Sequence, residues 1–170
     1  NITSAFFRFD AFNKVYVTSD TLRIGSGYWV QFESDGQLIF NSLDQANESI
    51  KKFYPKDDWN KIIFKDNQGR VTCLYFGEDV ENKVFMLPPI FPNNDFDIRF
   101  EDGSYATELN KDISILIKCD SFPIKVSTTG KSLYIYSEGS EILKTVTQNK
   151  SITIDEKTSK IILKALVNKF

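Results

Sequence analysis

Short runs in which apolar and polar residues alternate fill most of this chain, and a period of two is typical of β-strands with one buried face. In the first part of the chain the pattern predicts strands over residues 5–10, 14–18, 28–32 and 37–40. After residue 58 it predicts strands over residues 61–65, 71–76, 83–87, 96–100, 113–118, 124–127, 132–136, 142–146, 151–154 and 160–166. Glycine-containing turns separate many of these runs. This regular succession predicts an all-β fold, an antiparallel β-sandwich.

One helix is expected between the two groups of strands. Ser42 and Gln45 have the spacing of a capping box, apolar residues then recur at helical spacing, and Pro55 ends the run. The sequence thus predicts a small N-terminal β unit over residues 1–41, a linker helix and turn over residues 42–58, and a β-sandwich domain over residues 59–170. About 40 residues form only a small core. We therefore expect the N-terminal unit to be incomplete as a stable fold by itself and to pack on other parts of the protein.

The segment over residues 87–92 contains Pro88, Pro89 and Pro92. Proline fixes φ and removes a backbone donor, so this segment cannot be a helix or a central strand. We expect it to run extended along an edge or to cross between sheets.

The charge balance excludes several partners. The 21 Lys and Arg nearly cancel the 23 Asp and Glu, for a formal net charge of −2. No strong field is available to attract nucleic acid, so we expect none to bind. No apolar run reaches the roughly 20 residues of a membrane helix, and we expect no membrane insertion. The 15 Phe, 7 Tyr and 2 Trp also suit a β protein.

The chain contains no histidine, which removes the commonest general base and the usual ligand of zinc or copper. Two close carboxylate pairs, Asp57 with Asp58 and Asp95 with Asp97, lack the spacing of a calcium loop, and we interpret them as solvated turns. No phosphate loop or nucleophile motif occurs. We therefore expect a protein that is not an enzyme and that holds no cofactor and no metal.

Two cysteines are present, Cys73 and Cys119. Cys119 continues the face of Ile115 and Ile117, and Cys73 shares a face with Tyr75, so two core-facing strands would bring the thiols together. A disulfide between them would contribute about 4 kcal/mol. The alternative is that both are buried free thiols that act as small apolar groups.

Five aromatic residues are candidates for a sugar-binding surface, because flat amphipathic rings match the apolar faces of pyranoses. They fall into two alternative sets: Tyr28, Trp29 and Trp59 form one, and Tyr134 and Tyr136, on one face of a strand, form the other. The alternative is that these rings fill the interior of the sandwich.

Several segments together resemble a known group of proteins. Residues 16–32, which include Thr-Leu at 21–22 and Gly-Tyr-Trp-Val-Gln-Phe at 27–32, are similar to a pattern in secreted surface proteins of Bacteroidota and Ignavibacteria-type bacteria. Residues 74–77 (Leu-Tyr-Phe-Gly) and 87–100 (Leu-Pro-Pro and Phe-Asp-Ile-Arg-Phe) resemble the pattern that follows it in the same proteins. Such proteins are commonly cargo of the type IX secretion system. The resemblance covers most of residues 4–166 and implies an extracellular or cell-surface location, but it defines no active site.

The sequence departs from that group at two points. Ile90 and Phe91 replace a proline-rich continuation, and the strand that usually precedes the Gly-Tyr-Trp half is absent. Together these observations predict a non-enzymatic extracellular protein, structural or adhesive, whose partners are other copies of itself or other surface proteins. Strand addition, with residues 161–167 as a donor, would build a filament. The alternative is a carbohydrate-binding module of a secreted multidomain protein, with polysaccharide as its partner.

Overall fold

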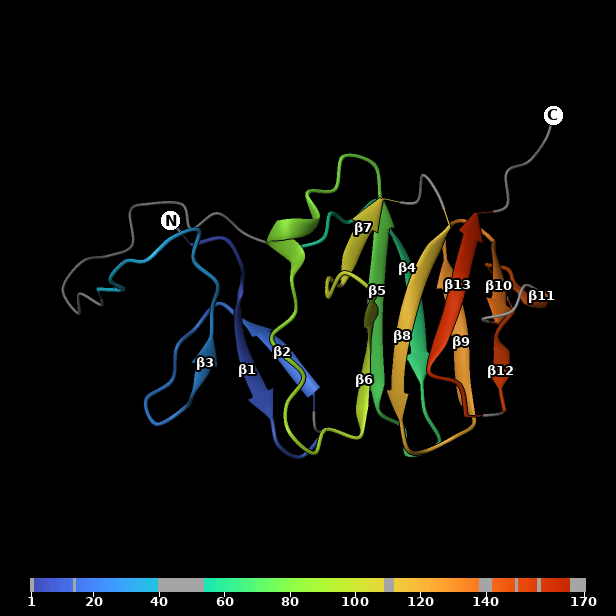
Figure 1. Cartoon of the computed structure of the whole chain (residues 1–170), viewed down its shortest axis with the longest axis horizontal. Coiled ribbons are helices and arrows are strands. Elements are labelled where there is room, and N and C mark those ends of the chain that lie inside the picture. The colour runs from blue at the N-terminus through green and yellow to red at the C-terminus, as the bar shows by residue number, and fades with distance from the viewer. Residues whose placement is uncertain are drawn as a thin grey trace.

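A computed structural model describes residues 2–13, 15–39, 54–108, 112–137, 142–148, 150–155 and 157–165 (Figure 1). Within these ranges the chain forms thirteen strands and one 3-10 helix. The first strands are β1 (Phe6–Asp10), β2 (Val15–Ser19) and β3 (Tyr28–Trp29). They are followed by β4 (Asn60–Lys65), β5 (Val71–Gly77), the 3-10 helix η1 (Asn82–Phe85), β6 (Phe96–Phe100), β7 (Ala106–Glu108) and β8 (Ile113–Cys119). The last are β9 (Ile124–Thr129), β10 (Leu133–Ser137), β11 (Ile142–Val146), β12 (Ile152–Ile154) and β13 (Lys160–Ala165).

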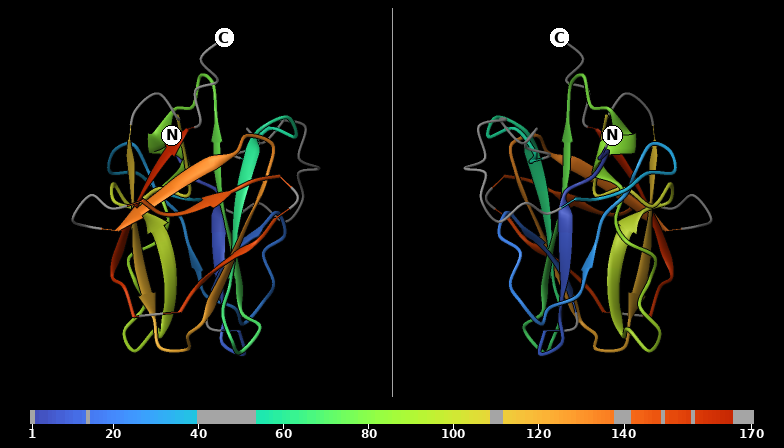
Figure 2. Two further views of the ribbon diagram at one scale, coloured as in Figure 1. Left: turned by 90° about the vertical axis from the view of Figure 1, so that its right-hand side faces the viewer. Right: turned by 90° about the vertical axis from the view of Figure 1, so that its left-hand side faces the viewer.

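Two five-stranded sheets pack face to face as a sandwich, which confirms the predicted fold class (Figure 2). One sheet has the order β11-β10-β13-β8-β6 and the other the order β12-β9-β4-β5-β7. Neighbouring strands are antiparallel except β5 and β7, which are parallel. Both sheets lie within the range predicted for the sandwich domain, and the third sheet, of three strands, lies within the predicted N-terminal unit.

The core follows the alternation of the sequence. In β8 the inward Ile113, Ile115 and Ile117 are buried while the residues between them are more exposed. On the facing sheet Phe64 and Leu74 are fully buried. Burial of one such side chain contributes about 2 kcal/mol, so this interior supplies most of the stability of the fold.

The N-terminal sheet has the order β2-β1-β3 and lies beside the open side of the sandwich that is bounded by β6 and β7 (Figures 1 and 2). Phe7 is the only fully buried residue of β1, and its ring centroid lies 5.9 Å from that of Trp29 and 6.1 Å from that of Tyr105. The small sheet thus buries one face against the larger domain, which agrees with the expectation that it packs on the rest of the chain.

The proline segment joins the two parts. The Arg99 guanidinium on β6 donates to the Pro88 carbonyl at 2.8 Å, and the ring of Phe91 stacks on that of Phe9 at 4.4 Å. No strand or helix covers residues 87–92, as the prolines predict. The segment therefore crosses between the sandwich and the N-terminal sheet.

Several local predictions differ from the structure. Residues 83–87 do not form a strand, because η1 and a single bridge from Met86 to Ser104 occupy this region. Residues 37–39 also form no strand, and residue 40 lies outside the described residues, as does the predicted helix over residues 42–53. β7 was not predicted, because three residues carry too little alternation to distinguish a strand.

The C-terminal strand occupies an internal position. β13 pairs with β10 on one side and with β8 on the other. Ile161 and Leu163 on this strand are fully buried. The proposed use of this segment as a donor strand is therefore wrong for the described residues up to 165, since it already completes the sheet of its own chain.

Of the two alternatives for the cysteines, the structure has the free thiols, and the candidate disulfide is absent. The reason is which face each residue occupies. Leu74 and Phe76 are the inward residues of β5, so Cys73 lies on the outer face of its sheet, whereas Cys119 is buried on the inner face of the other sheet. Cys119 therefore faces the interior while Cys73 points out of the sandwich, and the sheet of Cys73 separates the two thiols.

Candidate binding cleft

The five candidate aromatic residues lie in three separate places. β3, with Tyr28 and Trp29, and β10, with Tyr134 and Tyr136, stand at opposite ends of the long axis of the molecule (Figure 1). Trp59 is only 7% exposed, which makes it a core residue. A single five-residue sugar platform does not form.

Each pair has its own environment. Trp29 packs on Phe7, and the Tyr28 hydroxyl accepts a hydrogen bond from the Arg23 backbone at 2.9 Å, so both belong to the N-terminal sheet and its turn. Tyr134 and Tyr136 are half-buried on the outer face of β10, with ring centroids 6.4 Å apart and planes inclined at 60°. Inclined rings do not make one flat stacking surface.

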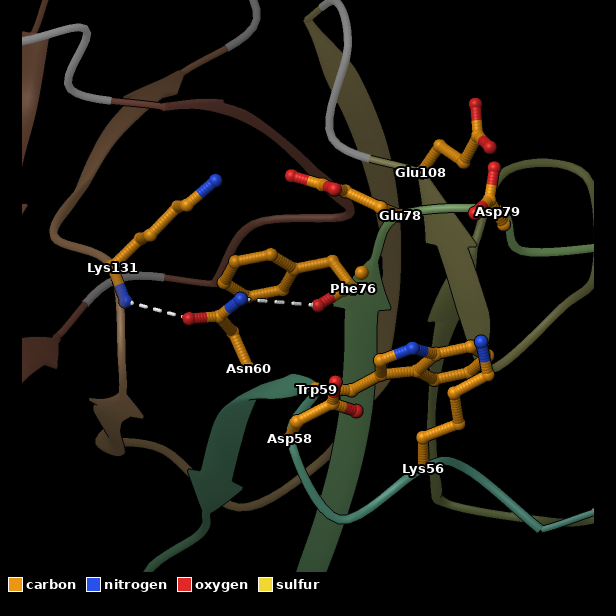
Figure 3. Close-up of a pocket in the computed structure, with 10 residues that line it drawn as sticks. Lys56, Asp58, Trp59, Asn60, Phe76, Glu78, Asp79, Glu108 and Lys131 are labelled. Atoms are coloured by element: carbon orange, nitrogen blue, oxygen red, sulfur yellow. Dashed lines mark hydrogen bonds between the residues drawn. The ribbon is translucent and has the colours of Figure 1, made fainter.

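A polar cleft of about 780 Å³ lies at one end of the sandwich, where several strands and turns meet (Figure 3). Sequence reasoning did not identify it, apart from Trp59 in its wall. The start of β4, the end of β5 with the turn after it, the end of β7 and the turn after β9 surround it. Its lining residues are Lys56, Asp58, Trp59, Asn60, Phe76, Gly77, Glu78, Asp79, Glu108 and Lys131. Loops at the end of a rigid sandwich are a usual location for binding residues.

Asn60 fixes the base of the cleft by linking three segments. Its side-chain amide donates to the Phe76 carbonyl at 3.3 Å, and its side-chain oxygen accepts from the Lys131 backbone at 2.8 Å (Figure 3). Gly130 has a φ of +97°, and a Cβ there would lie 1.9 Å from the Asn60 oxygen. This turn therefore needs glycine both for its conformation and for the space that Asn60 occupies.

Trp59 forms a rigid wall rather than an open stacking surface. Its ring packs edge-on against Phe85 at 5.2 Å, and the Lys56 ammonium lies 5.9 Å from the ring centroid. A Cβ on Gly77 would lie 2.4 Å from the indole Cδ1, so the ring rests directly on the backbone of β5. With its ring enclosed in this way, Trp59 shapes the cleft and leaves recognition to the polar groups.

Charged side chains dominate the remaining lining. Asp58, Glu78 and Asp79 are exposed, and Glu108 accepts a hydrogen bond from the Val80 backbone at 3.3 Å. Among the residues that the structure describes, no ion pair joins Lys56 or Lys131 to a carboxylate. The carboxylates of Asp58, Glu78 and Asp79 thus stay accessible to solvent and to a ligand in the cleft.

The carboxylate pairs noted in the sequence have different roles. Asp97 makes two hydrogen bonds of 2.6 Å with Arg99, so its charge is already neutralised. Asp58 lines the cleft, whereas Asp57 is exposed beside it. Neither pair provides a calcium loop.

One group of potential metal ligands occurs within the described ranges, formed by Asp66, Cys119 and Asp120. Arg70 lies among them, and its Nε donates to Asp66 at 2.6 Å while its Nη2 donates to Asp120. Burial raises the pKa of the Cys119 thiol, and of the Cys73 thiol on the other sheet. A guanidinium partner and a neutral thiol make the group of Asp66, Cys119 and Asp120 a structural network.

Comparison with known proteins identifies no relative: no protein-family model, curated protein or solved structure matches this chain. Among the described residues, no helix is long and apolar enough to cross a bilayer. The fold and the cleft therefore define this chain only as an all-β sandwich protein with a polar end cleft, and its function is inferred from these features.

Proposed function

We propose that this chain is a non-enzymatic extracellular protein that acts in adhesion, with the end cleft as its ligand-binding site. The observation that carries the proposal is the cleft itself: the exposed charged side chains of Lys56, Asp58, Glu78, Asp79 and Lys131 surround a base that Asn60 holds in place. A rigid base with outward polar groups favours binding, because little side-chain freedom is lost at the centre of the site.

The chemistry of the lining favours binding over catalysis. The chain has no histidine, and its two thiols lie outside the cleft with raised pKa values. The four carboxylates in the cleft stand on three different segments, and among the described lining residues none lies beside a base that would activate a nucleophile. An extracellular location is the expectation from the resemblance in residues 16–32 and 87–100.

Adhesion can be tested with beads that carry the purified protein and are presented to intact bacterial cells. The proposal predicts adhesion well above that of albumin-coated beads and a clear loss in the variant Glu78→Arg, which reverses charge at the cleft. Asp57→Arg is the matched control, because Asp57 is an exposed neighbour that does not line the cleft. Adhesion no greater than that of albumin, or recovery of the native protein only from the cytoplasmic fraction, would contradict the proposal.

A carbohydrate-binding module is the second candidate, favoured by the half-buried Tyr134 and Tyr136 on the outer face of β10. Affinity electrophoresis in soluble polysaccharides separates the two sites. If polysaccharide retards the native protein and Glu78→Arg but not the double variant Tyr134→Ala, Tyr136→Ala, the result would favour a carbohydrate-binding module that binds through the outer face of β10. The opposite pattern would favour the cleft.

Assembly into filaments is a separate proposal, which needs an edge strand. β13 and β1 are both internal in their sheets, so addition of a second copy would use an edge such as β2 or β11. Electron microscopy of the native protein, with fibres or discrete particles as the outcome, tests it directly.

A further inference from the structure

Two Asp-Gly sequences occur in this chain, at residues 35–36 and 102–103, and Asn-Gly does not occur. In an Asp-Gly pair the main-chain nitrogen of glycine can attack the side-chain carboxyl carbon of aspartate, because glycine has no Cβ to hinder the approach. The attack closes a ring and needs a free carboxyl group, a free nitrogen and a main chain that can rotate. The fold therefore decides which of the two pairs reacts.

The pair at residues 102–103 is held by the turn after β6. The Asp102 carboxylate accepts hydrogen bonds from the Ser104 main-chain nitrogen at 2.9 Å, the Ser104 hydroxyl at 2.6 Å and the Asn82 amide at 2.9 Å. The nitrogen that would attack is also engaged, because the Gly103 N–H donates to the Phe100 carbonyl at 2.9 Å. Both reacting groups at this site are therefore bound to other partners.

The pair at residues 35–36 is open. Both residues are exposed, and the segment over residues 33–39 forms no strand or helix. It follows β3 at the end of the molecule away from the sandwich, where Figure 1 draws it in light blue. To the described part of the chain, neither the Asp35 carboxylate nor the Gly36 N–H makes a hydrogen bond. A Cβ at Gly36 would meet only the Ser34 carbonyl oxygen, at 3.9 Å, so the main chain has room to rotate.

We propose that Asp35 converts spontaneously to isoaspartate through a succinimide, which makes residues 35–36 a self-modification site. The Gly36 nitrogen forms a bond to Cγ of Asp35, and the carboxyl hydroxyl leaves with the proton of that nitrogen as water. A water molecule then opens the ring at one of its carbonyl carbons. Attack at Cγ restores aspartate, whereas attack at the main-chain carbonyl gives isoaspartate, in which the main chain runs through Cβ and Cγ. The steps consume no oxidant, reductant or cofactor, and the water released is regained.

The hydrogen bonds at residues 102–103 set the size of the difference between the two pairs. Before Gly103 can attack, its own N–H must leave the Phe100 carbonyl, and the bonds from Ser104 and Asn82 to the carboxylate must open. Each such hydrogen bond slows the reaction about fivefold, so together they slow it about a hundredfold. Isoaspartate at residue 35 lengthens the main chain by a single carbon in a segment outside the three sheets. The stability of the fold should therefore be unchanged by it.

Incubation of the full chain in mildly acidic buffer at physiological temperature, followed by peptide mapping, tests the inference. Electron-transfer fragmentation distinguishes isoaspartate from aspartate, and endoproteinase Asp-N does not cleave before isoaspartate. We expect isoaspartate to form at residue 35 about a hundredfold faster than at residue 102. The variant Gly36→Ala should slow the reaction, and Asp35→Glu should prevent it because glutamate would have to close a larger ring. Both variants should keep the native unfolding midpoint in urea.

Incubation of the chain in guanidinium chloride is the matched control, because unfolding opens both turns. The two pairs should then react at similar rates. The inference would be overturned if aspartate persisted at residue 35 of the folded protein, or if the two pairs of the folded protein reacted equally fast. A pair at residues 102–103 that stayed slow in the denaturant, or an unchanged rate in Gly36→Ala, would overturn it as well.

Discussion

The indole ring of Trp59 lies so close to Gly77 that a β-carbon at that glycine would stand 2.4 Å from the ring. This contact fixes the wall of the cleft to the end of β5 and explains why the strand ends in glycine. It also makes position 77 sensitive to the smallest possible change.

The substitution Gly77→Ala should therefore destabilise the protein by about 1–3 kcal/mol, because the added methyl group forces the ring or the strand to move. Urea unfolding followed by tryptophan fluorescence measures the effect. Gly27→Ala is the control, since a Cβ there meets no atom within 4 Å, and its effect should stay within about 0.5 kcal/mol. Equal stability of the two variants would show that Trp59 moves freely.

Leu163→Ala should destabilise the isolated chain by about 2–5 kcal/mol, because Leu163 is fully buried on the internal strand β13. The neighbouring Lys164→Ala is the control, and we expect little change because that side chain is 52% exposed. Urea unfolding of a dilute, monomeric sample makes the test independent of assembly. If Leu163→Ala left the unfolding free energy of the monomer unchanged, the result would support donation of this strand to a neighbouring copy.

Asp97→Asn should lower the free energy of unfolding by about 3 kcal/mol, because it leaves the charge of Arg99 without its carboxylate partner. Both side chains are only 8% exposed. Arg99 also bonds to the proline segment, so we expect limited proteolysis to cut residues 87–92 faster in this variant. The control is Glu101→Gln, which removes the more exposed ion pair with Lys160. We expect this variant to change neither the unfolding free energy nor the cleavage rate by much. Unchanged cleavage would show that the pair does not hold the segment.

Stability should fall at alkaline pH. Burial raises the pKa of the Cys73 and Cys119 thiols above the ordinary value of 9.0, so the unfolded chain loses these protons first. The contribution of the two protonated thiols to the unfolding free energy is complete below about pH 8. It is lost as the pH rises through their pKa in the folded protein. The variant Cys73→Ala, Cys119→Ala should show a shallower decline in unfolding free energy from about pH 8 to 10. Identical slopes in the two proteins would contradict this account.

The positions of most strands follow from the sequence. Phe96–Phe100 and Ile142–Val146 match the predicted bounds, because their alternation and flanking turns are local signals. Local signals do not decide which face of a strand points inward. For Cys73 the predicted face was wrong because both faces of β5 carry apolar residues, and only packing shows that Leu74 and Phe76 face the core.

The sequence by itself determined an all-β sandwich, a proline segment that is neither helix nor central strand, and a chain without histidine chemistry. The tertiary structure alone decided that β13 is internal, that the aromatic residues are dispersed and that a cleft forms around Asn60. The physical reason is sequence distance. The cleft brings together residues 56–60, 76–79, 108 and 131, and their proximity depends on sheet order, which no short-range pattern encodes.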